Sequence, residues 1–222
     1  MLGQWSRPVL EAWIGIFAKL LPVLARENGG AREQQFVQKG VNIVKKMSQR
    51  TETLAVRTSS ALLIGAIADA NSLLKAEVFE QNFLSIVTNI CQDFNWEVRK
   101  EICGQLPFIS KYLGPSKAYE YLYPELKELL DDEEREVVTT AIAAFGYMVE
   151  QFLGSENEDN DLGDKEAVRI ELNGQLKKML TSESFIGKID ISRILLLNAF
   201  WIATLIDQPS DSQLQQALLA LL

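Results

Sequence analysis

A pattern of paired helical segments that recurs about every 40 residues constrains this chain more than any other sequence feature. Three segments can be laid over one another: 41–68, 84–109 and 123–149. In each segment an apolar stretch with helical spacing leads through a short turn into a second helix that opens near a valine. These valines are Val56, Val98 and Val137, so the period is 42 residues and then 39. Chains with this period fold as stacked helical hairpins.

Helical spacing of apolar residues continues along nearly the whole chain, and no alternating stretch indicates a strand. We therefore expect an all-α fold with helices at 8–26, 31–49, 54–70, 75–92, 96–113, 116–131, 133–153, 165–181, 189–206 and 211–222. Short connections make neighbouring helices antiparallel. The prediction is a single α-solenoid segment over 1–222, with repeats at about 31–70, 75–113, 116–153 and 165–206. Both ends fall within a partial repeat, so we expect a piece of a longer array or an end covered by a partner.

Two strings carry a resemblance to a known family: ICQDFNWEVRKEICGQLPFI at 90–109 and PELKELLDDEEREVVTTAIAAF at 124–145. They resemble HEAT repeats (ARM-like), which have an apolar first helix, an aspartate near the turn and Val-Arg at the start of the second helix. Pro124 matches the proline kink of such first helices. The LLDDEE turn and CQDFNWEVR are similar to the scaffold subunit of type 2A protein phosphatase and to a HEAT-type regulatory subunit of protein phosphatase 4.

The resemblance implies how the repeats join and which surfaces bind partners. Arg57 and Arg99 are expected to form a ladder with the aspartates of neighbouring turns, which Val138 interrupts in the next copy. The turns inside the hairpins would line up as a ridge that holds partner subunits, while the second helices line the concave face. The ridge would carry 49–53, 94–96, 131–135 and 184–188.

Within this ridge the candidate protein-binding residues are Phe94, Asn95, Trp96, Asp131, Asp132, Glu133 and Arg135. Two aromatic residues in one short turn cannot both belong to the core, and aromatic side chains dominate the energetics of many interfaces. For Trp96 two interpretations stay open: it binds a partner, or it folds back to cap its hairpin. The tyrosines at 112, 119, 121 and 123 are interpreted as packing between hairpins.

Charge and composition narrow the functional class. The net charge is −8, while residues 1–50 hold eight Lys or Arg and three Glu, so the rest of the chain is strongly acidic. An acidic body argues against nucleic-acid binding. No apolar run reaches the ~18 residues that cross a bilayer, and no signal peptide is evident. We expect a cytoplasmic protein that binds other proteins and neither nucleic acid nor membrane.

Catalytic patterns are not found in the sequence. The chain has no histidine and no phosphate-binding glycine loop, and its two cysteines, Cys91 and Cys103, lack the spacing of a zinc site. The carboxylates at 131–134 fall in a turn that we expect to be exposed, and exposed carboxylates are poor acid–base catalysts. We therefore predict no enzyme activity, no cofactor and no metal. The acidic stretch 154–166 is predicted to be a solvated loop or a contact segment; its Asp159 and Asp161 spacing does not complete a calcium loop.

Two functions follow from these features. One is a scaffolding or regulatory subunit of a serine/threonine protein phosphatase, which would hold the catalytic subunit along the ridge. The alternative is a structural or adaptor segment of another large assembly, of the transport, cytoskeletal or ciliary kind. The sequence leaves this choice open.

Overall fold

The computed structural model describes residues 8, 9, 12–16, 31–69, 76–153, 165–181 and 198, with the side chains of 31–37 and 76–78 left out. Within these residues every regular element is a helix. The labelled helices are α2 (Ala31–Met47), α3 (Leu54–Asp69), α4 (Ala76–Cys91), α5 (Trp96–Leu113), α6 (Pro115–Tyr121), α7 (Tyr123–Leu130), α8 (Arg135–Leu153) and α9 (Lys165–Thr181). The expected helices at 189–206 and 211–222 and most of the acidic loop lie outside the described residues.

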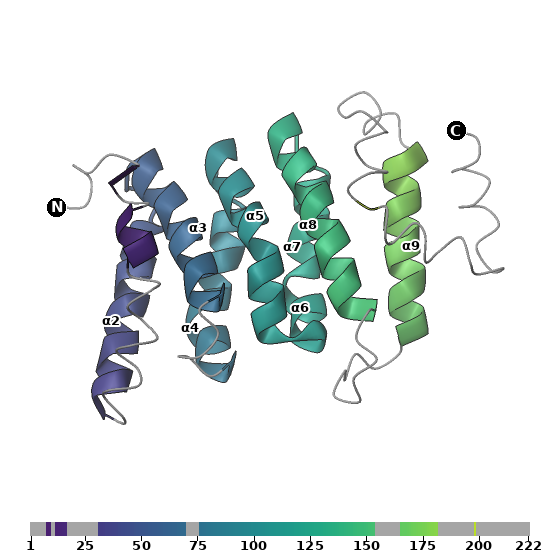
Figure 1. Ribbon diagram of the computed structural model, residues 1–222. Helices are drawn as coiled ribbons and strands as arrows, with labels where there is room; N and C mark the ends of the chain where they lie inside the picture. Colours follow the sequence, from purple (N-terminus) through teal and green to yellow (C-terminus); the bar gives the residue numbers. More distant parts are fainter. Residues whose placement is uncertain are drawn as a thin grey trace.

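The helices form an α-solenoid of antiparallel hairpins in two layers, as predicted (Figure 1). The second helices of the hairpins, α3, α5 and α8, lie side by side and contact one another along their length. The first helices, α2, α4 and α7, pack behind them, and α9 extends the array beside α7 and α8. No helix among the described residues has the length and apolar character needed to cross a membrane.

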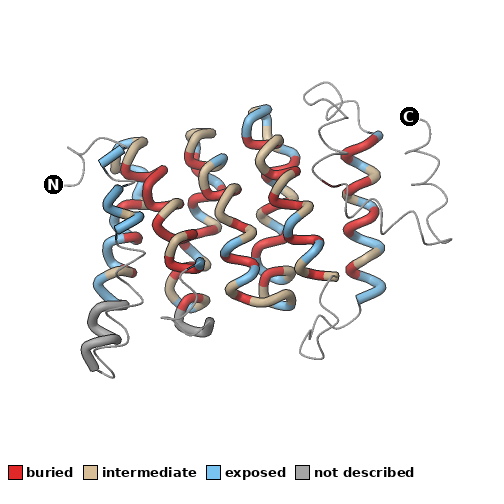
Figure 2. The backbone as a smooth tube through the Cα atoms, in the orientation of Figure 1, coloured by how far each residue is buried: buried red, intermediate tan, exposed pale blue. Residues whose placement is uncertain are grey.

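The repeating valines explain why the hairpins stack in register. Val56, Val98 and Val137 are all fully buried at the start of their second helices. Apolar residues at helical spacing follow each valine and are buried between the layers, among them Ile102, Leu106, Ile109, Ala141, Phe145 and Val149. Buried residues recur along the helices of both layers (Figure 2) and belong to one hydrophobic core cluster. Each repeat therefore completes its core only by packing against its neighbours.

One expected helix is divided in two. The sequence predicts a single helix over 116–131, whereas the structure has α6 and α7 with a junction at Leu122, where φ is −98° and ψ is −31°. Pro124 is the physical reason, because it has no N–H to donate and its ring clashes with the carbonyl of Glu120, four residues earlier. The N–H of Leu122 still donates to Ala118 at 2.9 Å. The chain thus bends at the proline and keeps a helical path.

Candidate functional site

The turns inside three hairpins lie at the same edge of the solenoid, at the top of Figure 1. The structure places the ridge at residues 48–53, 92–95 and 131–134, and Trp96 and Arg135, which were predicted to belong to it, are instead the first residues of α5 and α8. Each turn follows a first helix and precedes a second helix, so the stacking of the hairpins places the turns in a row. The turn predicted at 184–188 lies outside the described residues.

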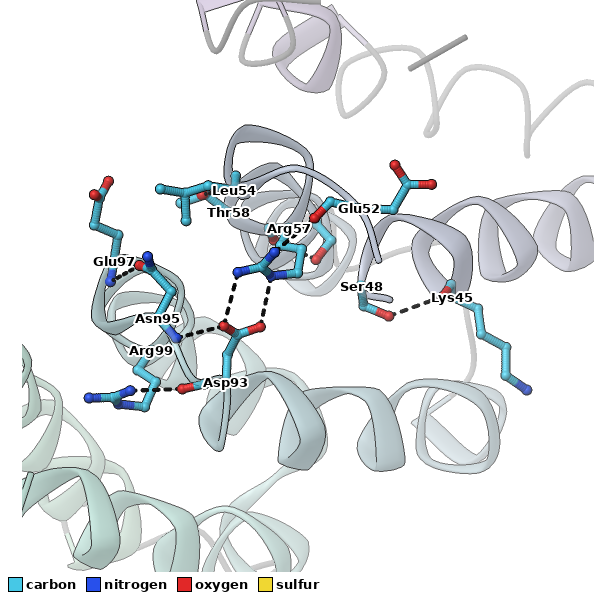
Figure 3. A network of polar contacts seen from close by, with 11 residues as sticks. Lys45, Ser48, Glu52, Leu54, Arg57, Thr58, Asp93, Asn95, Glu97 and Arg99 are labelled. Atoms are coloured by element: carbon cyan, nitrogen blue, oxygen red, sulfur yellow. Dashed lines mark hydrogen bonds and ion pairs between the residues drawn. The ribbon is translucent and has the colours of Figure 1, made fainter. Parts of the chain in front are cut away.

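A buried ion pair joins the first two turns. Arg57 Nε donates to Asp93 Oδ2 at 2.9 Å, and its Nη2 donates to Asp93 Oδ1 at 3.3 Å (Figure 3). The side chains of Arg57 and Asp93 are only 5% and 4% exposed. Arg57 Nη1 also donates to the carbonyl of Glu52 in its own turn, at 2.8 Å. One guanidinium therefore holds two consecutive turns together.

The second rung repeats this geometry one repeat later. Arg99 donates from Nε and Nη2 to the carboxylate of Asp132, at 2.7 and 2.9 Å. Its Nη1 donates to the carbonyl of Asp93 at 2.7 Å. The hydrogen bond to Asp132 raises the pKa of Arg99 above its ordinary value. The predicted ladder role of Arg57 and Arg99 is confirmed at both rungs.

Val138 occupies the corresponding position in the next repeat and is buried. Its side chain has no donor, so it cannot extend the ladder. A different ion pair connects the third turn to the following helix, since Lys178 Nζ lies 2.5 Å from Asp131 Oδ2. Both side chains are about half exposed there, so solvent screens this contact much more than the two rungs.

The aspartates of the ladder also shape their own turns. Asp93 Oδ1 accepts a hydrogen bond from the backbone N–H of Asn95, and Asp132 Oδ1 accepts one from the N–H of Glu134, both at 2.9 Å. Asn95 in turn caps α5, because its Oδ1 accepts from the N–H of Glu97 at 2.9 Å. Asn95 and Asp132, two of the predicted binding residues, are therefore engaged in holding the turns.

The two aromatic residues of the second turn have different environments. Trp96 is half-buried and packs against the core, with Lys100 Nζ 5.9 Å from its ring centroid. Phe94 is 66% exposed, and the guanidinium carbon of Arg57 lies 4.4 Å from its ring centroid. One face of the Phe94 ring covers the buried ion pair, so the remaining surface of the ring points outward. The capping interpretation of Trp96 is the one that its burial favours.

Charge changes sign along the ridge. Arg50 in the first turn is an exposed cation, and Lys45 and Lys46 are exposed beside it in the last turn of α2. Phe94 follows in the middle. The third turn exposes Asp131, which is paired with Lys178, and Glu133, and the exposed Arg135 follows as the first residue of α8. The ridge therefore presents a basic end, an aromatic centre and a mainly acidic end.

Of the four tyrosines interpreted from the sequence as packing between hairpins, three pack in or against the core, namely Tyr112, Tyr119 and Tyr123. The interpretation is wrong for Tyr121, which is 38% exposed. Tyr123 is buried and stacks on Tyr119 with ring centroids 5.1 Å apart. Burial raises the pKa of both hydroxyls. Tyr119 donates to Glu171 of α9, and Lys127 Nζ lies 2.7 Å from the same carboxylate. These contacts, chiefly the hydrogen bond from Lys127, lower the pKa of Glu171.

Sequence reasoning missed two exposed aromatic residues on the layer of second helices. Phe108 of α5 is 45% exposed and Tyr147 of α8 is 63% exposed. Their spacing in the sequence could have identified them, because the two residues are 39 apart, the same spacing that separates Val98 from Val137.

Among the described residues, no group of three or more acidic, cysteine or histidine side chains is placed to hold a metal ion. Cys91 and Cys103 are buried, and burial raises the pKa of both thiols.

Comparison with known proteins identifies one matching family and two relatives of this chain. The model of a family described as "PIK3R4-like, middle domain" matches residues 24–167, more than half of the chain. The human serine/threonine-protein phosphatase 4 regulatory subunit 4 is 28% identical over 141 residues, which cover 64% of this chain and 15% of that protein. The mouse protein of the same name is 29% identical over 112 residues, covering 50% and 12%. The chain thus matches a small part of the length of these relatives, and the resemblance to a HEAT-type regulatory subunit of phosphatase 4 is confirmed.

Proposed function

The chain belongs to the family of PIK3R4-like middle domains, and from that premise we propose that it is a non-catalytic scaffold whose ridge binds another protein. The partner to test first is the catalytic subunit of a serine/threonine protein phosphatase, since two relatives are named as regulatory subunits of phosphatase 4. The observation that carries the proposal is Phe94, an exposed aromatic ring on a turn that buried ion pairs hold in place.

A rigid platform favours binding because little conformational entropy is lost when the partner arrives. Two arginines hold the turn that carries Phe94. Arg57 donates a hydrogen bond to the Asp93 carboxylate, and Arg99 donates one to the Asp93 carbonyl. The ring itself is exposed and large, the combination found in interface residues whose truncation costs ~2 kcal/mol or more. A partner that matches the ridge would offer an apolar pocket between an acidic patch and a basic patch.

The test uses the purified 222-residue chain and purified catalytic subunits of phosphatases 4 and 2A, with binding measured by biolayer interferometry. Replacing Phe94 by serine is expected to weaken binding about 30-fold, the equivalent of ~2 kcal/mol. Glu133→Lys should weaken it as well, with an effect that shrinks in high salt. Trp96 is kept unchanged because it packs against the core.

Tyr147→Ser is the matched control, since Tyr147 is as exposed as Phe94 but lies on the layer of second helices. It should bind like the parent chain. If the two serine variants lose affinity equally, the ridge is not the binding surface. If the parent chain binds neither catalytic subunit, the phosphatase proposal is wrong. The adaptor role in another assembly would then be the better hypothesis.

A further inference from the structure

A second surface feature lies on the layer of second helices, away from the ridge. Ala66 of α3, Phe108 of α5 and Tyr147 of α8 follow one another at 42 and 39 residues, the spacing of the repeating valines. They therefore occupy equivalent positions in three successive repeats. Phe108 and Tyr147 project their rings to the surface, whereas Ala66 is half-buried and has no ring. The array lacks one aromatic side chain at the position of Ala66.

A groove of about 380 Å³ lies at that position. The described residues that line it are Ile14, Gly15, Leu62, Gly65, Ala66, Asp69, Glu101, Gln105 and Phe108. Its volume is at the lower end of the ~300–1,000 Å³ typical of binding pockets. The groove therefore has room for a large apolar side chain with part of its backbone.

The floor of the groove is firmly built. A Cβ atom at Gly65 would lie 2.0 Å from Gln105 Oε1 and 2.9 Å from Gln105 Cβ, so the Gln105 side chain rests directly on the backbone of α3. This close approach is possible only because residue 65 is glycine. It brings α3 and α5 together at the groove, where Leu62 and Ala66 of α3 and Phe108 of α5 are part of the apolar lining.

Charge defines what else the occupant must carry. Asp69 and Glu101 both line the groove, and the described lining residues include no lysine or arginine. Asp69 ends α3 and is exposed. The exposed carboxylate of Asp69 beside an apolar hollow is complementary to a segment that carries a large apolar side chain with a lysine or arginine near it.

We propose that this groove binds a short extended peptide segment of a partner protein, with a large apolar side chain over Ala66 and a neighbouring lysine or arginine facing Asp69. Phe108 lies 12 residues after the start of α5, about 18 Å along the helix from the turn of Phe94 at 1.5 Å per residue. The groove is thus separate from the ridge, and both sites can be occupied together.

The test is a selection of random 12-residue peptides on the purified chain, followed by fluorescence anisotropy of the enriched peptides. Enriched sequences should place Phe, Leu, Ile, Met or Trp within about three residues of Lys or Arg. Ala66→Phe should weaken binding about tenfold or more, because the ring fills the space that the peptide side chain would bury. The variant introduces at residue 66 the phenylalanine that occupies the equivalent position of α5, so we expect the chain to fold normally.

Asp69→Lys provides an independent variant, because this exposed residue can change without affecting the core. It should weaken the same peptides about tenfold, and more at low salt than at high salt. Phe94→Ser should leave peptide binding unchanged, which separates this site from the ridge. The proposal is overturned if no sequence is enriched, if the enriched peptides are acidic, or if Asp69→Lys binds them as the parent chain does.

Discussion

Replacing Asp93 by alanine removes the acceptor on which the second turn depends. Its carboxylate receives two hydrogen bonds from Arg57 and one from the backbone of Asn95. After the substitution the Arg57 guanidinium stays charged and remains where its side chain is 5% exposed. Its hydrogen bond to the Glu52 carbonyl and its contact with Phe94 persist, but neither supplies an opposing charge.

Leaving one partner of a buried ion pair unpaired typically costs ~3–5 kcal/mol. We expect Asp93→Ala to reduce the free energy of unfolding by about that amount. Asp131→Ala is the matched control, since it also removes an aspartate of a ridge turn that pairs with a cation. The Asp131–Lys178 pair is half exposed, so its loss should cost ~0–1 kcal/mol.

Urea unfolding followed by far-UV circular dichroism gives both values from the midpoints and slopes. Because stacked repeats can open separately, hydrogen exchange measured by mass spectrometry should accompany it. Peptides covering 48–57 and 92–99 should exchange faster in Asp93→Ala, while those of α9 change little. The double variant Arg57→Met with Asp93→Leu should recover part of the loss, because it leaves no buried charge.

Equal costs for Asp93→Ala and Asp131→Ala would refute this reasoning. So would a double variant less stable than Asp93→Ala, since the ion pair would then stabilise the fold through more than the neutralisation of Arg57. Equal costs would mean that solvent screens the rungs of the ladder despite their burial.

Three further predictions concern packing, thiols and pH. Gly65→Ala should lower the free energy of unfolding by ~1–3 kcal/mol, because the new Cβ would clash with Gln105. Gly40→Ala should raise it by ~0.5–1 kcal/mol in the same urea assay, because a Cβ at residue 40 has no atom within 4 Å and alanine favours the helix. The thiols of Cys91 and Cys103 should react with Ellman's reagent only after the chain unfolds. Fast labelling of the folded chain would contradict their burial. Because the pKa of Glu171 is lowered in the folded chain, its stabilisation is complete above the ordinary glutamate pKa near ~4.3 and is lost as pH falls through the folded value, so Glu171→Gln should flatten the acid limb of a stability–pH curve.

The sequence predicted the helix pairs from local pattern, and the resemblance to HEAT repeats implied the ladder. The buried valines come at a fixed place in each repeat, and Arg57 and Arg99 directly follow two of them. A charged residue next to a core position must find a partner close to the helix start, and the aspartates of the adjacent turns lie there.

The environment of Phe94 and Trp96 was not predictable in the same way. Both are aromatic, both lie within one turn, and either could have packed inward. The outcome depends on where α5 begins: Asn95 caps it, so Trp96 becomes its first residue and packs against the core. Phe94 precedes the cap and is placed over Arg57 of the preceding repeat. The deciding contact is with a residue 37 positions earlier, which the local sequence does not specify.

The groove at Ala66 shows how the repeats can serve as their own comparison. The groove exists because residue 66 has a small side chain, and nothing in the sequence of α3 alone indicates that a larger one could occupy this position. Set against Phe108 and Tyr147, however, Ala66 is the one small residue of its series. Positions that agree among the repeats form the core, as the valines do, whereas positions that differ among them, on the ridge and on the second helices, are where one array can bind partners that a uniform array could not.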